Sequence, residues 1–247
     1  MKRIVQKLYF YYFYAVMALL FLLFYPCFFC LLLKQQWHPH AHALRRKGVG
    51  WLFALTGIKV NVQQEASLDP NQVYLFCGNH FSELDILILL NSLPVHPVSF
   101  MGKKELASLP FFGRLFRNLD ITVDRENPQR ALRSFKKTMA FLKQGHPLVI
   151  FPEGGIYALP PQVTPFKDGA FELAIKSKVP IVPLSLPDSW EAIDNDRMRG
   201  WPGKVHLVMH EPIVSKNYTK ADLPELKQQV FIIIEETINR FTNASNG

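Results

Sequence analysis

The chain has 247 residues, of which 49% are hydrophobic and 19% charged, proportions that fit one globular domain with a membrane element. Its formal net charge of +8 predicts an anionic partner, either a lipid headgroup, a phosphorylated substrate, an acidic carrier protein or nucleic acid. The three cysteines argue against a disulfide framework, and the CxxC pair at Cys27 and Cys30 lacks the second Cys or His pair that a structural zinc site needs.

The N-terminal region contains a long apolar run, because no residue from Leu8 to Leu33 carries a charge. As one helix the run would be about 39 Å long, which exceeds the roughly 30 Å thickness of the hydrocarbon core of a bilayer. A cleaved signal peptide would have a shorter apolar core, and residues 35–48 offer no convincing small-residue cleavage site. We therefore expect a retained membrane anchor. Pro26 leaves open a monotopic hairpin in one leaflet instead of a span.

Residues 38–59 combine basic and apolar side chains. Three consecutive basic residues, 45–47, lie close to Trp51, Leu52, Phe53 and Leu55. This mixture predicts a helix at the membrane interface, with an ordinary surface helix as the alternative. The alternating histidines of the segment HPHAH have no neighbouring carboxylate or cysteine, so we expect no metal site there. We assign residues 1–57 to a membrane-anchoring helical segment.

Residues 58–247 alternate strand-like and helix-like runs and read as one α/β domain. Short apolar runs predict buried strands at 58–62, 73–77, 98–101, 120–123, 148–151, 181–186 and 204–209. Asn127 and Pro128 suit the start of a helix that Gly145 ends, with apolar residues at helical spacing between them. A last amphipathic helix is predicted from about Leu223 to Phe241.

The segment CGNHFSELD, residues 77–85, carries the first chemical signal. Ser82 to Asp85 resembles a capping box, which places His80 in the turn between a buried strand and the helix predicted at 84–93. In this geometry Asp85 accepts a hydrogen bond from one ring nitrogen of His80, and the other ring nitrogen becomes a base for a hydroxyl or a water. The alternative is a structural histidine beside a helix whose cap is Asp85.

Five ordered motifs carry a family resemblance: NHFSELD, GKKELASLPFFGRLF, DITVDR, VIFPEGG and PFKDGAFELAIKSKVPIVPLSL. Together they resemble the glycerolipid acyltransferase family, which includes 1-acylglycerol-3-phosphate acyltransferases, over about residues 70 to 215. The resemblance implies an α/β fold with a mixed, largely parallel sheet wrapped by helices, and an N-terminal hydrophobic segment that beds the enzyme in the bilayer. It also implies that His80 is the general base and that Asp85 orients it.

Further site residues follow from the same resemblance. Glu153 corresponds to the family's glutamate, which positions the acceptor or the catalytic loops, and Gly154 allows close approach of the backbone. Lys103 and Arg125 occupy the family's basic positions and are the candidates for binding a phosphate. Surface salt bridges with Glu105 or Asp124 are the alternative role for these two cations. Lys104 and Lys167 are weaker candidates.

One motif departs from the family pattern. Many relatives read FPEGTRS, whose arginine contributes to phosphate recognition, whereas this chain reads FPEGGIY, with Gly155 and Ile156 in place of Thr and Arg. An apolar isoleucine cannot supply that charge. Either Lys103 and Arg125 suffice, or the acceptor is another lysolipid, such as a lyso-aminolipid or a lysophospholipid with a larger headgroup.

We expect an acyltransferase that moves a fatty acyl group from an acyl-carrier protein or coenzyme A thioester to the sn-2 hydroxyl of 1-acylglycerol-3-phosphate. Direct attack by the hydroxyl needs a base but no metal or cofactor, and the chain has no GxSxG motif for a serine nucleophile. We expect a monomer in the cytoplasmic membrane, with the catalytic domain (58–247) on the cytoplasmic side and no nucleic-acid partner. The competing functions are a membrane-anchored lipid-binding protein with a degenerate site and a lipid hydrolase.

Overall fold

A seven-stranded sheet forms the centre of the protein. The structure is a computed structural model that describes residues 1–94, 97–124, 128–157 and 159–246. Within these residues the strand order is β1-β9-β6-β2-β5-β3-β4. Among the strand pairings of the described residues in this sheet, only that of β6 with β9 is antiparallel, which confirms the predicted mixed, largely parallel sheet. The strands are β1 (Ile58–Gln64), β2 (Leu75–Gly78), β3 (Ser99–Lys103), β4 (Ile121–Val123), β5 (Leu148–Ile150), β6 (Ile181–Ser185) and β9 (Gly203–Met209).

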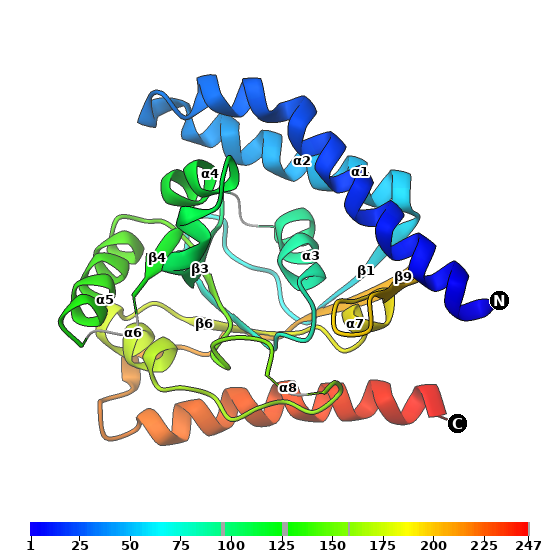
Figure 1. The fold of residues 1–247 in the computed structure, drawn as a ribbon. Coiled ribbons are helices and arrows are strands. Elements are labelled where there is room, and N and C mark those ends of the chain that lie inside the picture. Colours follow the sequence, from blue (N-terminus) through cyan, green and yellow to red (C-terminus); the bar gives the residue numbers. More distant parts are fainter. Residues whose placement is uncertain (95–96, 125–127, 158, 247) are drawn as a thin grey trace.

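Helices cover both faces of the sheet (Figure 1). Successive residues of β2 point to opposite faces, so Phe76 packs in one apolar cluster while Leu75 and Cys77 pack in the other. The Phe76 cluster draws on α1, α2 and α3, and the other cluster draws on α5, α6 and α8. These helices are α1 (Lys2–Leu31), α2 (His38–Thr56), α3 (Leu84–Ser92), α5 (Pro128–Lys143), α6 (Gly169–Ser177) and α8 (Leu223–Asn246).

The elements follow the predicted pattern with some additions. The helix expected after Asn127 is α5, although Asn127 itself lies outside the described residues, and the last helix runs past Phe241 to Asn246. Among the described residues, the elements that the sequence analysis did not assign are α4 (Phe112–Leu119), α6, α7 (Ser189–Ala192), the hairpin of β7 (Ile193–Asp194) and β8 (Arg199–Gly200), and the short helices η1 (Gln35–Trp37), η2 (Lys104–Ser108) and η3 (Ser215–Asn217).

The N-terminal region is a pair of helices that pack against each other along one side of the molecule (Figure 1). By length and composition α1 can cross a membrane, and only 11% of its most apolar window is buried inside the protein. The helix continues through Pro26. This apolar helix is consistent with a membrane anchor; whether it spans the bilayer or lies in one leaflet stays a prediction.

The inner side of α1 belongs to the core of the domain. Phe10, Phe13 and Leu20 are buried in the same cluster as Phe53 of α2 and Phe76 of β2. In contrast, residues such as Leu8, Leu19 and Leu23 of the same helix are exposed. One face of α1 therefore packs against the rest of the protein, and the opposite face is exposed and apolar.

Two arginines of α2 form hydrogen bonds with groups of the α/β domain instead of pointing into the surroundings. Arg45 forms a 2.7 Å ion pair with the buried Asp120 and donates to the carbonyl of Val98 at 3.0 Å. Arg46 donates to the carbonyl of Leu93 at 3.0 Å. Burial raises the pKa of Asp120, and the neighbouring Arg45 partly offsets that rise. The interface helix expected from these basic residues thus uses two of them for packing.

Candidate active site

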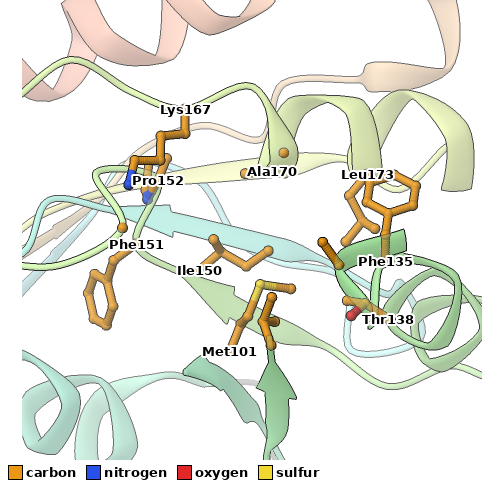
Figure 2. A pocket seen from close by; sticks show the side chains of 13 residues that line it. Met101, Phe135, Thr138, Ile150, Phe151, Pro152, Lys167, Ala170 and Leu173 are labelled. Atoms are coloured by element: carbon orange, nitrogen blue, oxygen red, sulfur yellow. The ribbon is translucent and has the colours of Figure 1, made fainter. Parts of the chain in front are cut away.

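The carboxyl ends of the parallel strands bring the predicted residues to one edge of the sheet. His80 follows β2, Glu153 follows β5 and Lys103 ends β3. In open α/β sheets, ligands bind at this edge. A cavity of about 190 Å³ opens here between β3, β5, α5 and α6, with mostly apolar walls that include Met101, Phe135 and Leu173 (Figure 2). Lys167 and Gly154 line it as well.

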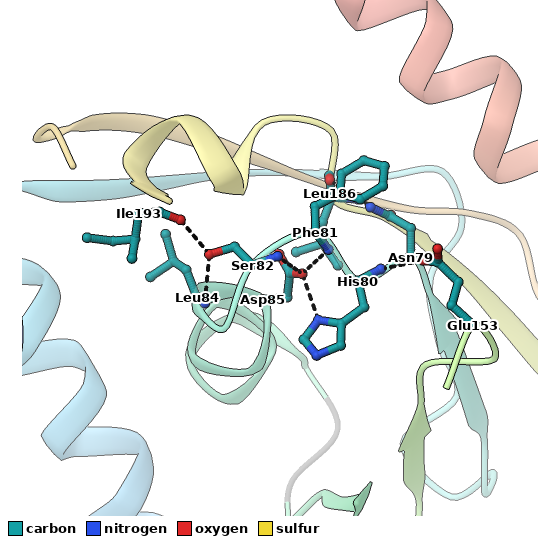
Figure 3. Close-up of polar contacts among 9 residues, drawn as sticks. All are labelled: Asn79, His80, Phe81, Ser82, Leu84, Asp85, Glu153, Leu186 and Ile193. Carbon is teal, nitrogen blue, oxygen red and sulfur yellow. Dashed lines mark hydrogen bonds and ion pairs between the residues drawn. The ribbon is translucent and has the colours of Figure 1, made fainter. Parts of the chain in front are cut away.

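His80 and Asp85 meet in the turn between β2 and α3 (Figure 3). Nδ1 of His80 lies 2.9 Å from Oδ2 of Asp85, which sits in the first turn of α3 and is fully buried. The same oxygen accepts hydrogen bonds from the amides of Phe81 at 2.8 Å and Ser82 at 2.9 Å. Because this oxygen acts as an acceptor, Nδ1 carries the proton and Nε2 is left as the acceptor.

The cap of α3 differs from the predicted capping box in one detail. Oγ of Ser82 accepts from the amide of Leu84 at 3.2 Å, whereas the amide of Asp85 donates to the Ser82 carbonyl at 3.0 Å. The Ser82 hydroxyl donates to the carbonyl of Ile193 at 2.7 Å. These bonds tie the His80 turn both to its own helix and to the β7–β8 hairpin.

Two further contacts hold the imidazole and its turn, and the sequence analysis found neither. The His80 ring stacks on Phe151, with centroids 4.0 Å apart and planes 12° from parallel. The side chain of Asn79 accepts from the amide of Leu186 at 2.8 Å and donates to its carbonyl at 2.9 Å. This pair joins the end of β2 to the end of β6. The imidazole thus has a fixed position, and Phe151 connects it to the wall of the cavity.

Glu153 braces the His80 turn. Its Oε1 accepts from the backbone amide of His80 at 2.7 Å, and its Oε2 accepts from the amide of Thr164 at 2.8 Å and from the Thr164 hydroxyl. Burial raises the pKa of Glu153, and the bonds from Thr164 and His80 oppose that rise. Both carboxylate oxygens are engaged within the protein, which fits positioning of the catalytic loops better than direct contact with an acceptor.

Glu153→Gln should lower the free energy of unfolding by about 1.5 to 3 kcal/mol, because an amide NH₂ would face either the His80 donor or the Thr164 donors. The pH dependence should change too. Since the folded pKa is raised, the wild type loses stability as pH rises from the ordinary glutamate pKa through the raised one, and glutamine removes this component. Denaturant unfolding at several pH values measures both effects, with the exposed Glu105→Gln as control. Equal stability of both variants at every pH would contradict the brace.

The candidate phosphate ligands are only partly described. The ammonium of Lys103 lies 5.9 Å from the centroid of the Tyr157 ring, and Arg125 lies outside the described residues. Lys104, one of the two weaker candidates, pairs with Asp124 at 3.2 Å.

Gly154 has a φ of +87°, a backbone conformation that favours glycine over residues with a side chain, so the turn that follows Glu153 needs a glycine at this position. Among the described residues, no three His, Cys, Asp or Glu side chains group as metal ligands.

Comparisons with known proteins agree with this architecture. Residues 59–187 match the family model described as Acyltransferase. The 1-acyl-sn-glycerol-3-phosphate acyltransferase of Helicobacter pylori is 33% identical, covering 76% of this chain and 79% of that protein. The enzyme of the same name from Escherichia coli is 29% identical over 76% of each chain. The crystal structure of the 1-acyl-sn-glycerophosphate acyltransferase of Thermotoga maritima superposes with a TM-score of 0.76, at 24% identity and 98% coverage of both chains.

Proposed function

Because the chain belongs to the acyltransferase family, we propose that it acylates the sn-2 hydroxyl of 1-acylglycerol-3-phosphate with an acyl thioester and releases phosphatidic acid. The observation that carries this proposal is the His80–Asp85 pair at 2.9 Å, fixed in a turn at the carboxyl edge of the sheet. The names of the relatives support the acceptor, since the enzymes of Helicobacter pylori and Escherichia coli are both named 1-acyl-sn-glycerol-3-phosphate acyltransferase.

The chemistry follows from the tautomer of His80. Nε2 accepts the proton of the acceptor hydroxyl as its oxygen attacks the thioester carbonyl, and the imidazolium is stabilised through Nδ1–H by Asp85. A new C–O bond forms, the C–S bond breaks, and the proton passes from Nε2 to the leaving sulfur. The products are the ester and a free thiol, with no change of oxidation state and no covalent enzyme intermediate.

The donor in this scheme is the thioester of acyl-carrier protein or of coenzyme A, and the reaction needs no further cofactor. The net charge of +8 suits an acidic carrier and an anionic lipid surface equally. The apolar cavity that Phe151 joins to His80 suits the hydrocarbon part of a substrate. We place the protein in the cytoplasmic membrane as a monomer, held by α1, with the catalytic domain on the cytoplasmic side.

The headgroup of the acceptor requires cations near His80. Lys103 is exposed at the end of β3, and among the described residues no ion pair engages its ammonium. Together with Arg125 it would bind the phosphate through charge-assisted hydrogen bonds.

Lys103→Met should raise KM for 1-acylglycerol-3-phosphate about 10-fold, as expected for the loss of one charge-assisted hydrogen bond of roughly 1.5 kcal/mol. The KM for the acyl thioester should stay unchanged. Initial rates with each substrate varied in turn make this distinction. An unchanged KM for 1-acylglycerol-3-phosphate in Lys103→Met would show that Lys103 does not bind the phosphate.

A second acceptor has one observation in its favour. A cavity of about 160 Å³ lies beside the same turn, and its lining includes Glu83, Asp196 and Arg197 together with the apolar Ile156. Carboxylates beside an apolar surface suit the ammonium of a lyso-aminolipid. Because this cavity is lined by Phe81 and Ser82 rather than by His80, we place this acceptor second.

Acceptor-dependent thiol release tests the reaction class. With purified full-length protein in detergent, release of free thiol from the acyl thioester should need 1-acylglycerol-3-phosphate and should match the phosphatidic acid formed, mole for mole. Thiol release without any acceptor would indicate a hydrolase. Binding of lipid without thiol release would indicate a lipid-binding protein.

A further inference from the structure

One aromatic ring beside the site contacts two cations. The ammonium of Lys103 lies 5.9 Å from the centroid of the Tyr157 ring, and the ammonium of Lys167 lies 5.3 Å from it. The two lysines come from separate segments, the end of β3 and the loop before α6. A cation within about 6 Å of an aromatic face is attracted by it. The Tyr157 ring therefore contacts two lysines that are far apart in the sequence.

The two ammonium groups have no acidic partner in the part of the chain that the structure describes. No ion pair there involves Lys103 or Lys167, whereas the adjacent Lys104 pairs with Asp124. Two like charges near one ring repel each other, and an anion bound to both would offset that repulsion. The pair thus favours an anionic ligand.

Gly155 allows the Tyr157 ring to lie back over its own turn. The phenolic hydroxyl donates to the carbonyl of Gly154 at 3.1 Å. A Cβ added at Gly155 would lie 2.9 Å from Cζ of the ring and 3.0 Å from its hydroxyl oxygen. Because Tyr157 is 60% exposed, the ring can move away from such a Cβ without unfolding the protein. A side chain at residue 155 would therefore displace the ring from the turn.

Hydrogen bonds also link the Tyr157 ring, through Gly154 and Glu153, to the turn that carries His80. Gly154, which accepts its hydrogen bond, follows Glu153, and Glu153 accepts from the amide of His80. Lys167 lines the apolar cavity and lies beside Pro152 (Figure 2). An anion bound to Lys167 would therefore lie beside that cavity.

We propose that Tyr157, admitted by Gly155, is a positioning residue that gathers Lys103 and Lys167 into a clamp for the phosphate of the acceptor. In this chain the clamp supplies the positive charge that Ile156 does not. The inference rests on the proposed function, because it takes the bound anion to be the phosphate of 1-acylglycerol-3-phosphate.

A double-mutant cycle with the full-length protein tests the clamp. Tyr157→Leu should raise KM for 1-acylglycerol-3-phosphate about 5-fold with little change in kcat, because two cation–π contacts are lost. Tyr157→Phe keeps the ring and should stay close to the wild type. Gly155→Ala should raise KM to a similar extent, and in the Tyr157→Leu background it should add nothing, since both changes act through one ring.

Charge removal completes the test. Lys167→Met should raise the acceptor KM about 10-fold, while Lys220→Met, at an exposed lysine before α8, should leave it unchanged. An unchanged KM in Tyr157→Leu and Lys167→Met would overturn the clamp, as would additive effects of Gly155→Ala and Tyr157→Leu. In those cases wild-type acylation of 1-acylglycerol-3-phosphate would leave the proposed function standing. If the wild type does not acylate that lipid, both fail.

Discussion

His80→Ala is expected to lower kcat by at least about 10²-fold while the protein keeps its fold. The substitution removes the base, but the backbone amide of residue 80 can still donate to Glu153. Asp85→Asn should cause a comparable loss. The side-chain oxygen of the introduced asparagine can accept the same three hydrogen bonds as Oδ2 of Asp85, but a neutral amide does not supply the negative charge that stabilises the imidazolium. Initial rates and a thermal melt of each variant provide the measurement.

The chain contains a matched control for this experiment. His206 and Asp188 form a second His–Asp pair, with Nδ1 and Oδ2 2.5 Å apart, between β9 and the start of α7. If the role of His80 is catalytic, His206→Ala should retain kcat within about 2-fold, as expected for a partly exposed residue outside the site. A well-folded His80→Ala variant with nearly wild-type kcat would contradict the mechanism.

Phe13→Ala is expected to lower the free energy of unfolding by about 3 to 5 kcal/mol, as large-to-small changes of buried aromatic residues do. Phe13 is only 2% exposed and packs in the cluster that includes Phe76 of the central sheet. Denaturant unfolding in detergent micelles measures the loss. It should be accompanied by lower activity at elevated temperature, because α1 is part of the core that supports the site.

Leu19→Ala on the same helix is the control. Leu19 is 67% exposed, so its truncation should change the unfolding free energy by no more than about 0.5 kcal/mol. Equal small losses in Phe13→Ala and Leu19→Ala would mean that α1 does not share the core. Deletion of residues 1 to 33 is a less clear experiment, because it removes the exposed apolar side and the core-facing side of α1 together.

The sequence predicted features that depend on neighbouring residues. His80 and Asp85 are five positions apart, and the strand-to-helix turn between them could be predicted from the apolar runs and from Ser82. The α5 and α8 helices were predictable because each has apolar residues at helical spacing. The family resemblance then indicated that the strands of the sheet are largely parallel, which the periodicity of apolar residues alone does not show.

Long-range partners were not predictable from local pattern. Asn79 binds Leu186 across 107 residues, and Arg45 binds Asp120 across 75. Both pairs depend on how strands and helices come together in space. The departure from the family motif at Gly155 and Ile156 could be seen in the sequence. The contacts of the Tyr157 ring with two lysines could not, because those lysines come from other segments of the chain.

Hydropathy also could not divide the N-terminal run into its two faces. An apolar residue that faces lipid and one that faces a protein core have the same hydropathy, so Phe13 and Leu19 carried the same signal. The packing of α1 on α2 and on the sheet decides which of them is buried. The same argument applies to Arg45 and Arg46, whose charges suggested a membrane surface but bind buried groups of the domain.

Acceptor preference tests the central claim most directly. Purified full-length protein would be given equal concentrations of 1-acylglycerol-3-phosphate, monoacylglycerol, a lysophospholipid with a larger headgroup and a lyso-aminolipid, first with an acyl-carrier protein thioester and then with a coenzyme A thioester. The products would be identified by mass. The account predicts phosphatidic acid as the main product with at least one donor. Preferred acylation of the uncharged or the amine-bearing acceptor would contradict it.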